Sequence, residues 1–152
     1  CYKISAVDRA GNESELSEPF CFDNCPYYEL PNVFTPNDDG CNELFSAFSD
    51  RVTVDEDGIG TCGGPVDLED LKKRCARFVQ KVNFTVYNRW GKEVYTYQSG
   101  SERTIYIDWD GRDNNGKELS SGVYYYSAEV IFDVVDPKDQ KQIIKGWLQI
   151  VR

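Results

Sequence analysis

The chain has 152 residues, which suits one domain with its own core, and its formal net charge is −9. The charge is uneven, because residues 1–60 hold 13 acidic and 3 basic residues whereas residues 61–152 hold 13 acidic and 14 basic residues. The acidic front half disfavours a nucleic-acid partner, which needs a basic surface. No apolar run approaches the roughly 18 residues of a membrane-spanning helix, so no membrane-spanning segment is expected.

Residues 2–7 alternate polar with apolar side chains and predict a strand, and residues 17–22 predict a second strand after a turn-rich loop. The motif AVD at residues 6–8, followed by AGNES at residues 10–14, resembles the end of a fibronectin type III or immunoglobulin-like module. We therefore interpret residues 1–24 as the C-terminal hairpin of such a module and residues 25–152 as a separate domain.

The first half of this second domain contains short elements. Pro31 and Pro36 confine residues 30–36 to an edge strand, because proline cannot donate to a sheet ladder. Residues 44–48 predict a short strand, and residues 50–64 are polar and glycine-rich, as in a surface insertion. Residues 67–74 place acids first and bases last, which predicts one short helix. Residues 78–87 predict a long strand with Val82, Phe84 and Val86 on its core face.

The second half alternates strand-like runs with turn signals. Residues 93–97, 104–109, 123–132 and 142–151 are rich in β-branched and aromatic residues and predict strands. The turn signals between them include Asp110-Gly111 and Asn115-Gly116, which adopt positive φ at low cost. Trp90, Trp109 and the tyrosines are interpreted as core and sheet-surface packing. The whole pattern predicts an all-β fold, an antiparallel β-sandwich.

Dispersed motifs of residues 25–152 resemble a known family, the gliding-motility-associated C-terminal domain, which is the type B sorting domain of the type IX secretion system in Bacteroidota. The motifs are LPNVFTPN at residues 30–37, NRWG at 88–91, WDG at 109–111, SGVYYY at 121–126 and KGWLQI at 145–150. The resemblance implies an immunoglobulin-like sandwich of about seven strands, with one short helix in an insertion.

The resemblance also implies a function. The domain would be a non-catalytic secretion and cell-surface attachment signal at the end of a large surface protein, secreted and held at the cell surface or outer membrane. The implied partners are the type IX secretion translocon and a PorP/SprF-like outer-membrane barrel protein. The expected partner-binding residues lie in two turns and one strand: Asn88, Arg89, Trp90, Gly91, Asp110, Gly111, Asn115, Gly116, Lys145 and Gly146. The strand at residues 145–151 is expected to offer an edge for strand addition.

The alternative function is a carbohydrate- or protein-binding adhesin module, which exposed tyrosines clustered on one face would favour.

Catalysis is not expected, because the chain has no His, the commonest general base, and no GxSxG motif. Asp108 and Asp110 flank Trp109 and are interpreted as turn residues rather than as a pair of catalytic acids.

The six cysteines predict disulfides in an oxidising compartment, because the chain has no CxxC pair and no His for a zinc site. Six cysteines allow 15 connectivities, among which we favour Cys1–Cys21, Cys25–Cys75 and Cys41–Cys62.

No cofactor is expected other than a possible calcium ion. The loop at residues 37–43 has oxygen ligands suited to calcium in Asn37, Asp39 and Glu43. The alternative is an Asx-turn in which these side chains bond their own backbone.

Overall fold

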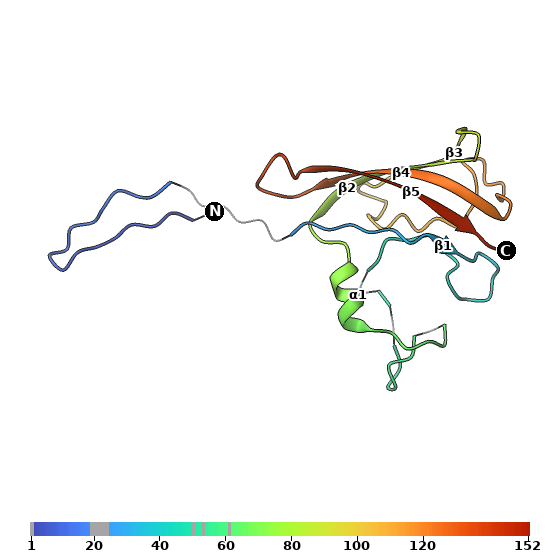
Figure 1. The fold of residues 1–152 in the computed structure, drawn as a ribbon, viewed down its shortest axis with the longest axis horizontal. Helices are drawn as coiled ribbons and strands as arrows, with labels where there is room; N and C mark the ends of the chain where they lie inside the picture. Colours follow the sequence, from blue (N-terminus) through green and yellow to red (C-terminus); the bar gives the residue numbers. More distant parts are fainter. Residues whose placement is uncertain (1, 19–24, 50, 53, 61) are drawn as a thin grey trace.

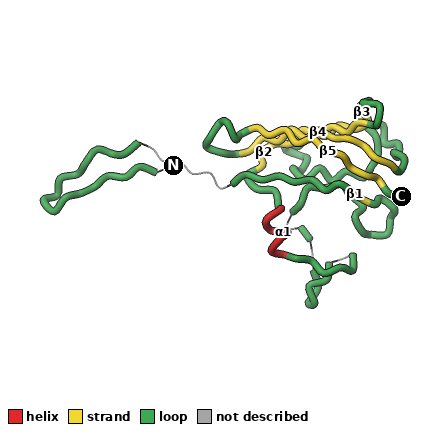
Figure 2. Tube along the Cα trace, in the orientation of Figure 1, coloured by secondary structure: helices red, strands yellow, loops and turns green. Residues whose placement is uncertain are grey.

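The computed structural model describes residues 2–18, 25–49, 51–52, 54–60 and 62–152. One sheet dominates this part of the chain (Figures 1 and 2). Its strands are β1 (Val33–Phe34), β2 (Val79–Tyr87), β3 (Glu93–Gln98), β4 (Gly122–Phe132) and β5 (Lys141–Ile150), in the order β1-β5-β4-β2-β3. β1 pairs with β5 in parallel, and the other neighbours are antiparallel. The all-β prediction is confirmed, and among the described residues no helix is long and apolar enough to cross a membrane.

The alternating pattern of β2 places every second side chain in the core. Val82, Phe84 and Val86 are almost fully buried, as predicted, while the residues between them face outwards. The partners on β4 alternate in the same way, since Phe84 lies opposite Ala128 and Val86 opposite Tyr126. One face of the sheet is therefore apolar and covered, and the other is open to solvent.

Irregular segments, rather than a second regular sheet, cover the inner face. The loop layer consists of residues 27–30, 44–49 and 105–112, which run beneath the sheet (Figure 2). Phe45 and Trp109 exchange two backbone hydrogen bonds of 2.8 and 3.1 Å within this layer. Trp109 is 2% exposed and its ring stacks on that of Tyr95, with the ring centroids 4.9 Å apart. The expected sandwich of about seven strands thus stays a prediction, because the named strands of the described part form one five-stranded sheet.

Two predicted strands are corrected. Residues 44–48 and 104–109 form only the isolated bridge between Phe45 and Trp109. Ile107 and Asp108 have φ angles of 77° and 51°, which lie in the left-handed region and turn the chain at the point where a strand would continue. The apolar run that predicts the strand instead buries Ile107 and Trp109 as single anchors.

The helix α1 (Leu68–Arg74) confirms the helix predicted from the order of its charges. Asp67 caps it, because its carboxylate accepts the N–H groups of Glu69 and Asp70 at 3.0 Å each. Arg74 in its last turn pairs with Glu29 in the loop layer, which fixes the helix to that layer.

Residues 2–18 form a hairpin that is held by short-range bonds (Figure 1, blue). Val7 bridges Glu13, and the Asp8 carboxylate accepts the N–H groups of Ala10 and Asn12. The predicted strand at residues 2–7 is reduced to isolated bridges. Of the second predicted strand, residues 19–22 lie outside the described residues, as do Cys1 and Cys21.

Candidate functional site

The turn after β2 presents an exposed tryptophan on a rigid base. The Asn88 side-chain oxygen accepts the N–H groups of Trp90 and Lys92 at 3.0 Å each, and Gly91 adopts a φ of 76°. The Trp90 side chain is 76% exposed, with the Arg89 guanidinium 4.3 Å from its ring centroid. Packing was expected of this residue, so that interpretation is wrong for Trp90. The turn fixes its backbone and leaves its ring available for contact.

The predicted contact residues Asp110 and Gly111 are largely structural. The Trp109 indole N–H donates to the carbonyl of Arg112 at 2.7 Å, which folds the turn onto the core. Gly111 is buried at a φ of 79°, and a Cβ atom there would lie 3.2 Å from the Phe34 ring. Asp110 forms an ion pair with Arg112 at 3.2 Å.

Asn115 and Gly116, by contrast, are exposed at the tip of the next turn. The Asp113 carboxylate accepts the N–H groups of Asn115 and Lys117 at 2.9 Å each. Asn114 attaches this turn to the edge of β3, since its side-chain oxygen accepts the Thr96 N–H at 3.0 Å. The turn therefore has a fixed shape and an accessible tip.

Arg152 joins three loops through its guanidinium. It donates to the carbonyls of Pro36, Gly111 and Leu119 at 3.1, 3.2 and 3.2 Å. The sequence did not predict this role, because the three partners are backbone carbonyls, which every residue has, and no side-chain pattern marks them. The arginine connects the loop after β1, the turn after Trp109 and the segment before β4.

Lys145 and Gly146 on β5 have opposite orientations. Lys145 is exposed on the outer face, whereas Gly146 faces inwards beneath the ring of Tyr126, its partner on β4. The predicted free edge at residues 145–151 is only partly open, because Gln149 and Ile150 pair with β1. The outer face also carries a row of aromatic residues, with Tyr87, Tyr125 and Trp147 as successive cross-strand partners.

The oxygen-rich loop bonds to itself. Both oxygens of Glu43 accept backbone N–H groups, from Asp38 at 3.0 Å and from Gly40 at 2.9 Å. Asn37 donates to Asp39 at 2.9 Å, and this hydrogen bond is the main cause of the lowered pKa of Asp39. No group of three or more acidic, Cys or His side chains suited to a metal occurs in the described part of the chain. This geometry favours the Asx-turn alternative, and calcium binding stays a prediction.

The structure contains the disulfide Cys41–Cys62, one of the three favoured pairings, which ties this loop to the insertion. Cys25 and Cys75, expected to pair, are free thiols. The antiparallel bridge between Tyr27 and Arg77 explains this, because it directs Cys25 and Cys75 to opposite ends of the contact, beyond the reach of a disulfide. The pairing of Cys1 with Cys21 stays a prediction, since both lie outside the described residues.

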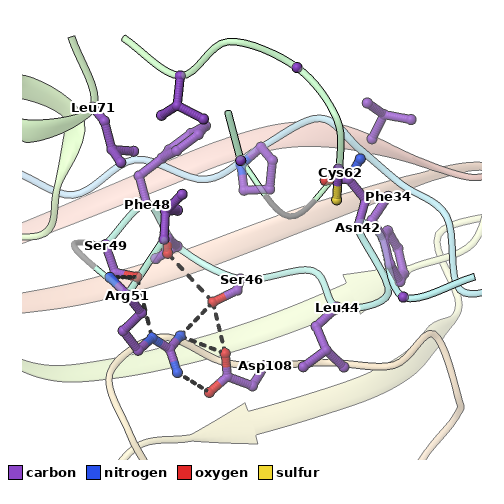
Figure 3. Close-up of a pocket in the computed structure, with 18 of the residues that line it drawn as sticks. Phe34, Asn42, Leu44, Ser46, Phe48, Ser49, Arg51, Cys62, Leu71 and Asp108 are labelled. Atoms are coloured by element: carbon purple, nitrogen blue, oxygen red, sulfur yellow. Dashed lines mark hydrogen bonds and ion pairs between the residues drawn. The ribbon is translucent and has the colours of Figure 1, made fainter. Parts of the chain in front are cut away.

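A cavity of about 770 Å³ lies between the loop layer and the insertion (Figure 3). Its wall includes an ion pair in which Arg51 donates to both oxygens of Asp108, at 2.8 and 3.1 Å. The Arg51 hydrogen bonds are the main cause of the lowered pKa of Asp108, together with a bond from Ser46. The Asp108 carboxylate is thus engaged by Arg51 and Ser46 and helps to hold the cavity wall together. Sequence reasoning missed this cavity.

The tyrosines are divided between the core and the surface. Tyr28, Tyr124 and Tyr126 are buried, whereas Tyr125 is 52% exposed. Burial raises the pKa of Tyr28, whose hydroxyl donates to the Ile105 carbonyl at 2.6 Å. Several tyrosines therefore belong to the core, while Tyr125 lies in the aromatic row on the outer face, and the adhesin alternative stays a prediction.

A family model described as CHU_C type IX secretion signal domain matches residues 28–150. Comparison with curated proteins and with solved structures finds no match. The matched region begins at Tyr28 in the loop layer and includes all five strands and α1.

Proposed function

The chain belongs to the CHU_C family of type IX secretion signal domains, and on this basis we propose that residues 25–152 are a folded, non-catalytic signal that is recognised by its shape. The family implies export through the type IX system, and hence a secreted or cell-surface protein. Retention at the cell surface or outer membrane is part of the proposal.

The arrangement of the two tryptophans carries this proposal. Trp109 is 2% exposed and organises the core, while Trp90 is 76% exposed on a turn fixed by Asn88. A linear tag needs only a few accessible residues. Here the exposed ring is positioned by strands that exist only in the folded domain, and the buried ring holds those strands against the loop layer.

The proposed contact surface consists of the accessible members of the expected set. These are Asn88 to Gly91, the tip at Asn115 and Gly116, and Lys145 on β5. Gly111 and Gly146 support this surface from below rather than touching a partner. The proposed partners are the type IX secretion translocon and a PorP/SprF-like outer-membrane barrel protein, which would hold the exported protein at the surface.

The finer architecture belongs to the same proposal. The sheet and the loop layer are the two layers of an immunoglobulin-like sandwich in which one layer is irregular. Residues 1–24 are the last hairpin of an upstream immunoglobulin- or fibronectin-like module. The hydrogen bonds described for residues 3–18 run within that hairpin, which supports a separate unit.

The test fuses this chain to the C-terminus of a periplasmic reporter, in a type IX-competent cell that also makes the partner barrel. The intact chain should carry the reporter to the cell surface. Trp109→Asp should keep it in the periplasm, because the charge unfolds the core. Trp90→Ala should keep the unfolding midpoint of the purified chain and still lower export. A reporter that stays periplasmic with the intact chain, or that an unfolded Trp109→Asp variant carries out equally well, would refute a signal recognised by its shape.

A further inference from the structure

The two edges of the sheet differ in how far neighbouring segments cover their backbone hydrogen-bonding groups. At the β3 edge, Asn114 donates its N–H to the Val94 carbonyl at 3.3 Å and accepts the Thr96 N–H at 3.0 Å. At the β5 edge, the Gln149 N–H donates to Asn32 at 2.8 Å. β1 is only two residues long, so it pairs with Gln149 and Ile150 and leaves the preceding part of β5 without a neighbouring strand.

The part of β5 before Gln149 has an open edge. The β4–β5 register has no shift, so Ile143, Lys145 and Trp147 direct their backbone N–H and C=O groups to the same side as Gln149, away from β4. In the part of the chain that the structure describes, none of these groups has a backbone partner. Natural proteins usually block such an edge, because it is a template for another strand.

The side chains along this edge define what would fit beside it. Ile143 and Trp147 are 56% and 48% exposed on the outer face, and Lys145 stands between them. Lys145 faces Ser127 on β4 and has no ion pair among the described residues, whereas its neighbour Lys141 pairs with Glu129. The edge therefore shows an apolar–basic–apolar pattern with an unneutralised charge at its centre.

We propose that β5 binds an extended segment of a partner protein by strand addition along Ile143 to Trp147. The segment carries apolar, acidic and apolar side chains at alternating positions. Its backbone completes the ladder left open by β1, its acidic residue faces Lys145, and its apolar residues cover Ile143 and Trp147. The proposal rests on the proposed function, since it identifies one contact through which a folded export signal is recognised.

A second copy of this chain is a poorer occupant of the same edge. Pairing two β5 strands would bring Lys141 and Lys145 of both copies along one seam, and like charges facing each other are destabilising. The charge pattern thus favours a different, acidic strand over self-association.

Binding can be tested on the full chain with synthetic peptides. The probe is a capped peptide with Val, Glu and Val at alternating positions, separated by Thr, and the matched control has Lys in place of Glu. At about ten times its dissociation constant, the Glu peptide should slow amide exchange at Ile143, Lys145 and Trp147 about tenfold, and the Lys peptide should bind more weakly. No slowing at these amides, equal binding of the two peptides, or self-association through this edge without peptide would overturn the proposal.

Two variants at one position separate the backbone contribution from the charge. Lys145→Ala keeps the outward N–H, so it should weaken binding of the Glu peptide only about two- to fivefold. Lys145→Pro removes the outward N–H without removing a bond to β4, so it should abolish binding while far-ultraviolet circular dichroism stays unchanged. If Lys145→Pro does not fold, the exchange measurement on the unaltered chain still decides the question.

The export assay separates this inference from the function on which it rests. With the reporter fusion, the intact chain should reach the surface and a folded Lys145→Pro variant should not. If the intact chain fails to export, the proposed function is wrong whatever the peptides do. If both chains export equally, the signal function holds and strand addition at β5 is wrong.

Discussion

The ring of Tyr126 lies across Gly146, its cross-strand partner. A Cβ atom at Gly146 would lie 2.6 Å from the Tyr126 hydroxyl oxygen and 2.7 Å from Cζ, closer than atoms can approach. The tyrosine cannot move away easily, because its ring packs on Phe45 and Phe84 with the centroids 5.9 and 5.7 Å apart. Glycine is therefore required here by packing and not by partner contact.

Gly146→Ala should lower the free energy of unfolding by about 1–3 kcal/mol, because the new methyl group forces the ring out of its place. Urea unfolding of the purified chain measures this change. Gly100→Ala is the matched control, since nothing lies within 4 Å of its Cβ position. An equal effect of the two substitutions would mean that the close approach is not what fixes this residue.

Arg152→Ala should destabilise the domain by about 1–3 kcal/mol, because three backbone carbonyls lose their donor together. Arg152→Lys should restore little, since one ammonium cannot reach carbonyls on three loops. Thermal unfolding distinguishes these cases. Arg89→Ala is the control, because within the described part of the chain its guanidinium lies on the exposed Trp90 ring and has no ion pair. Full rescue by lysine would show that charge, and not the arrangement of donors, matters.

Replacing both Cys41 and Cys62 by serine should cost about 3 kcal/mol of stability, as the chain-entropy model predicts for a loop of this length. Their sequence separation is 21 residues. Non-reducing peptide mapping should recover these two cysteines in one linked pair and leave Cys25 open to alkylation. A linked Cys25–Cys75 pair in that map would contradict the free thiols seen here.

The ion pair of Asp108 predicts a loss of stability in acid. Its pKa is lowered in the folded state, chiefly by the Arg51 hydrogen bonds, so the ionised carboxylate stabilises the fold. That contribution is complete above the unfolded pKa of about 3.9 and is lost as the pH falls through the lower folded pKa. Between about pH 6 and about pH 2, wild type should therefore lose more unfolding free energy than Asp108→Asn. Asp57→Asn, an exposed carboxylate without a described ion pair, should follow wild type.

The loop at residues 37–43 should keep its shape without calcium, because the Glu43 oxygens already accept two backbone N–H groups. Adding about 1 mM calcium or a chelator should leave the melting temperature of the domain unchanged. Glu43→Ala should lower the melting temperature both with calcium and with the chelator. Titration calorimetry provides the decisive comparison. Calcium binding that Asp39→Ala abolishes would establish the site predicted from the sequence.

The strands and the helix could be predicted because their signals are local. The period of two in β2, with Val82, Phe84 and Val86 inwards, is visible in nine consecutive residues. The helix could be predicted from the order of its charges, since Glu69 and Asp70 lie in its first turn and Lys72, Lys73 and Arg74 in its last turn. These patterns involve residues close together in the sequence, so they can be recognised without knowing the tertiary contacts.

The rest depended on contacts that no local pattern contains. Residues 104–109 have the composition of a strand, yet the positive φ angles of Ile107 and Asp108 turn the chain there, and Ile107 is buried without strand pairing. Tryptophan is a large apolar residue typical of a core, but the turn fixed by Asn88 leaves the Trp90 side chain exposed to solvent. The cavity at the insertion arises from segments that meet only after folding, so the sequence showed neither its walls nor its ion pair.

The parallel pairing of β1 with β5 has a kinetic consequence. Val33 pairs with Gln149, and the Arg152 side chain bonds to the Pro36 carbonyl across 116 positions of sequence. Contacts of such large sequence separation raise the contact order, which slows folding because loop closure costs entropy before the contact forms. A nascent or truncated chain without residues 141–152 leaves Phe34 uncovered and the first edge of the sheet unmade. Under the proposed function, a partner that recognises the folded shape would therefore not bind a chain that lacks β5.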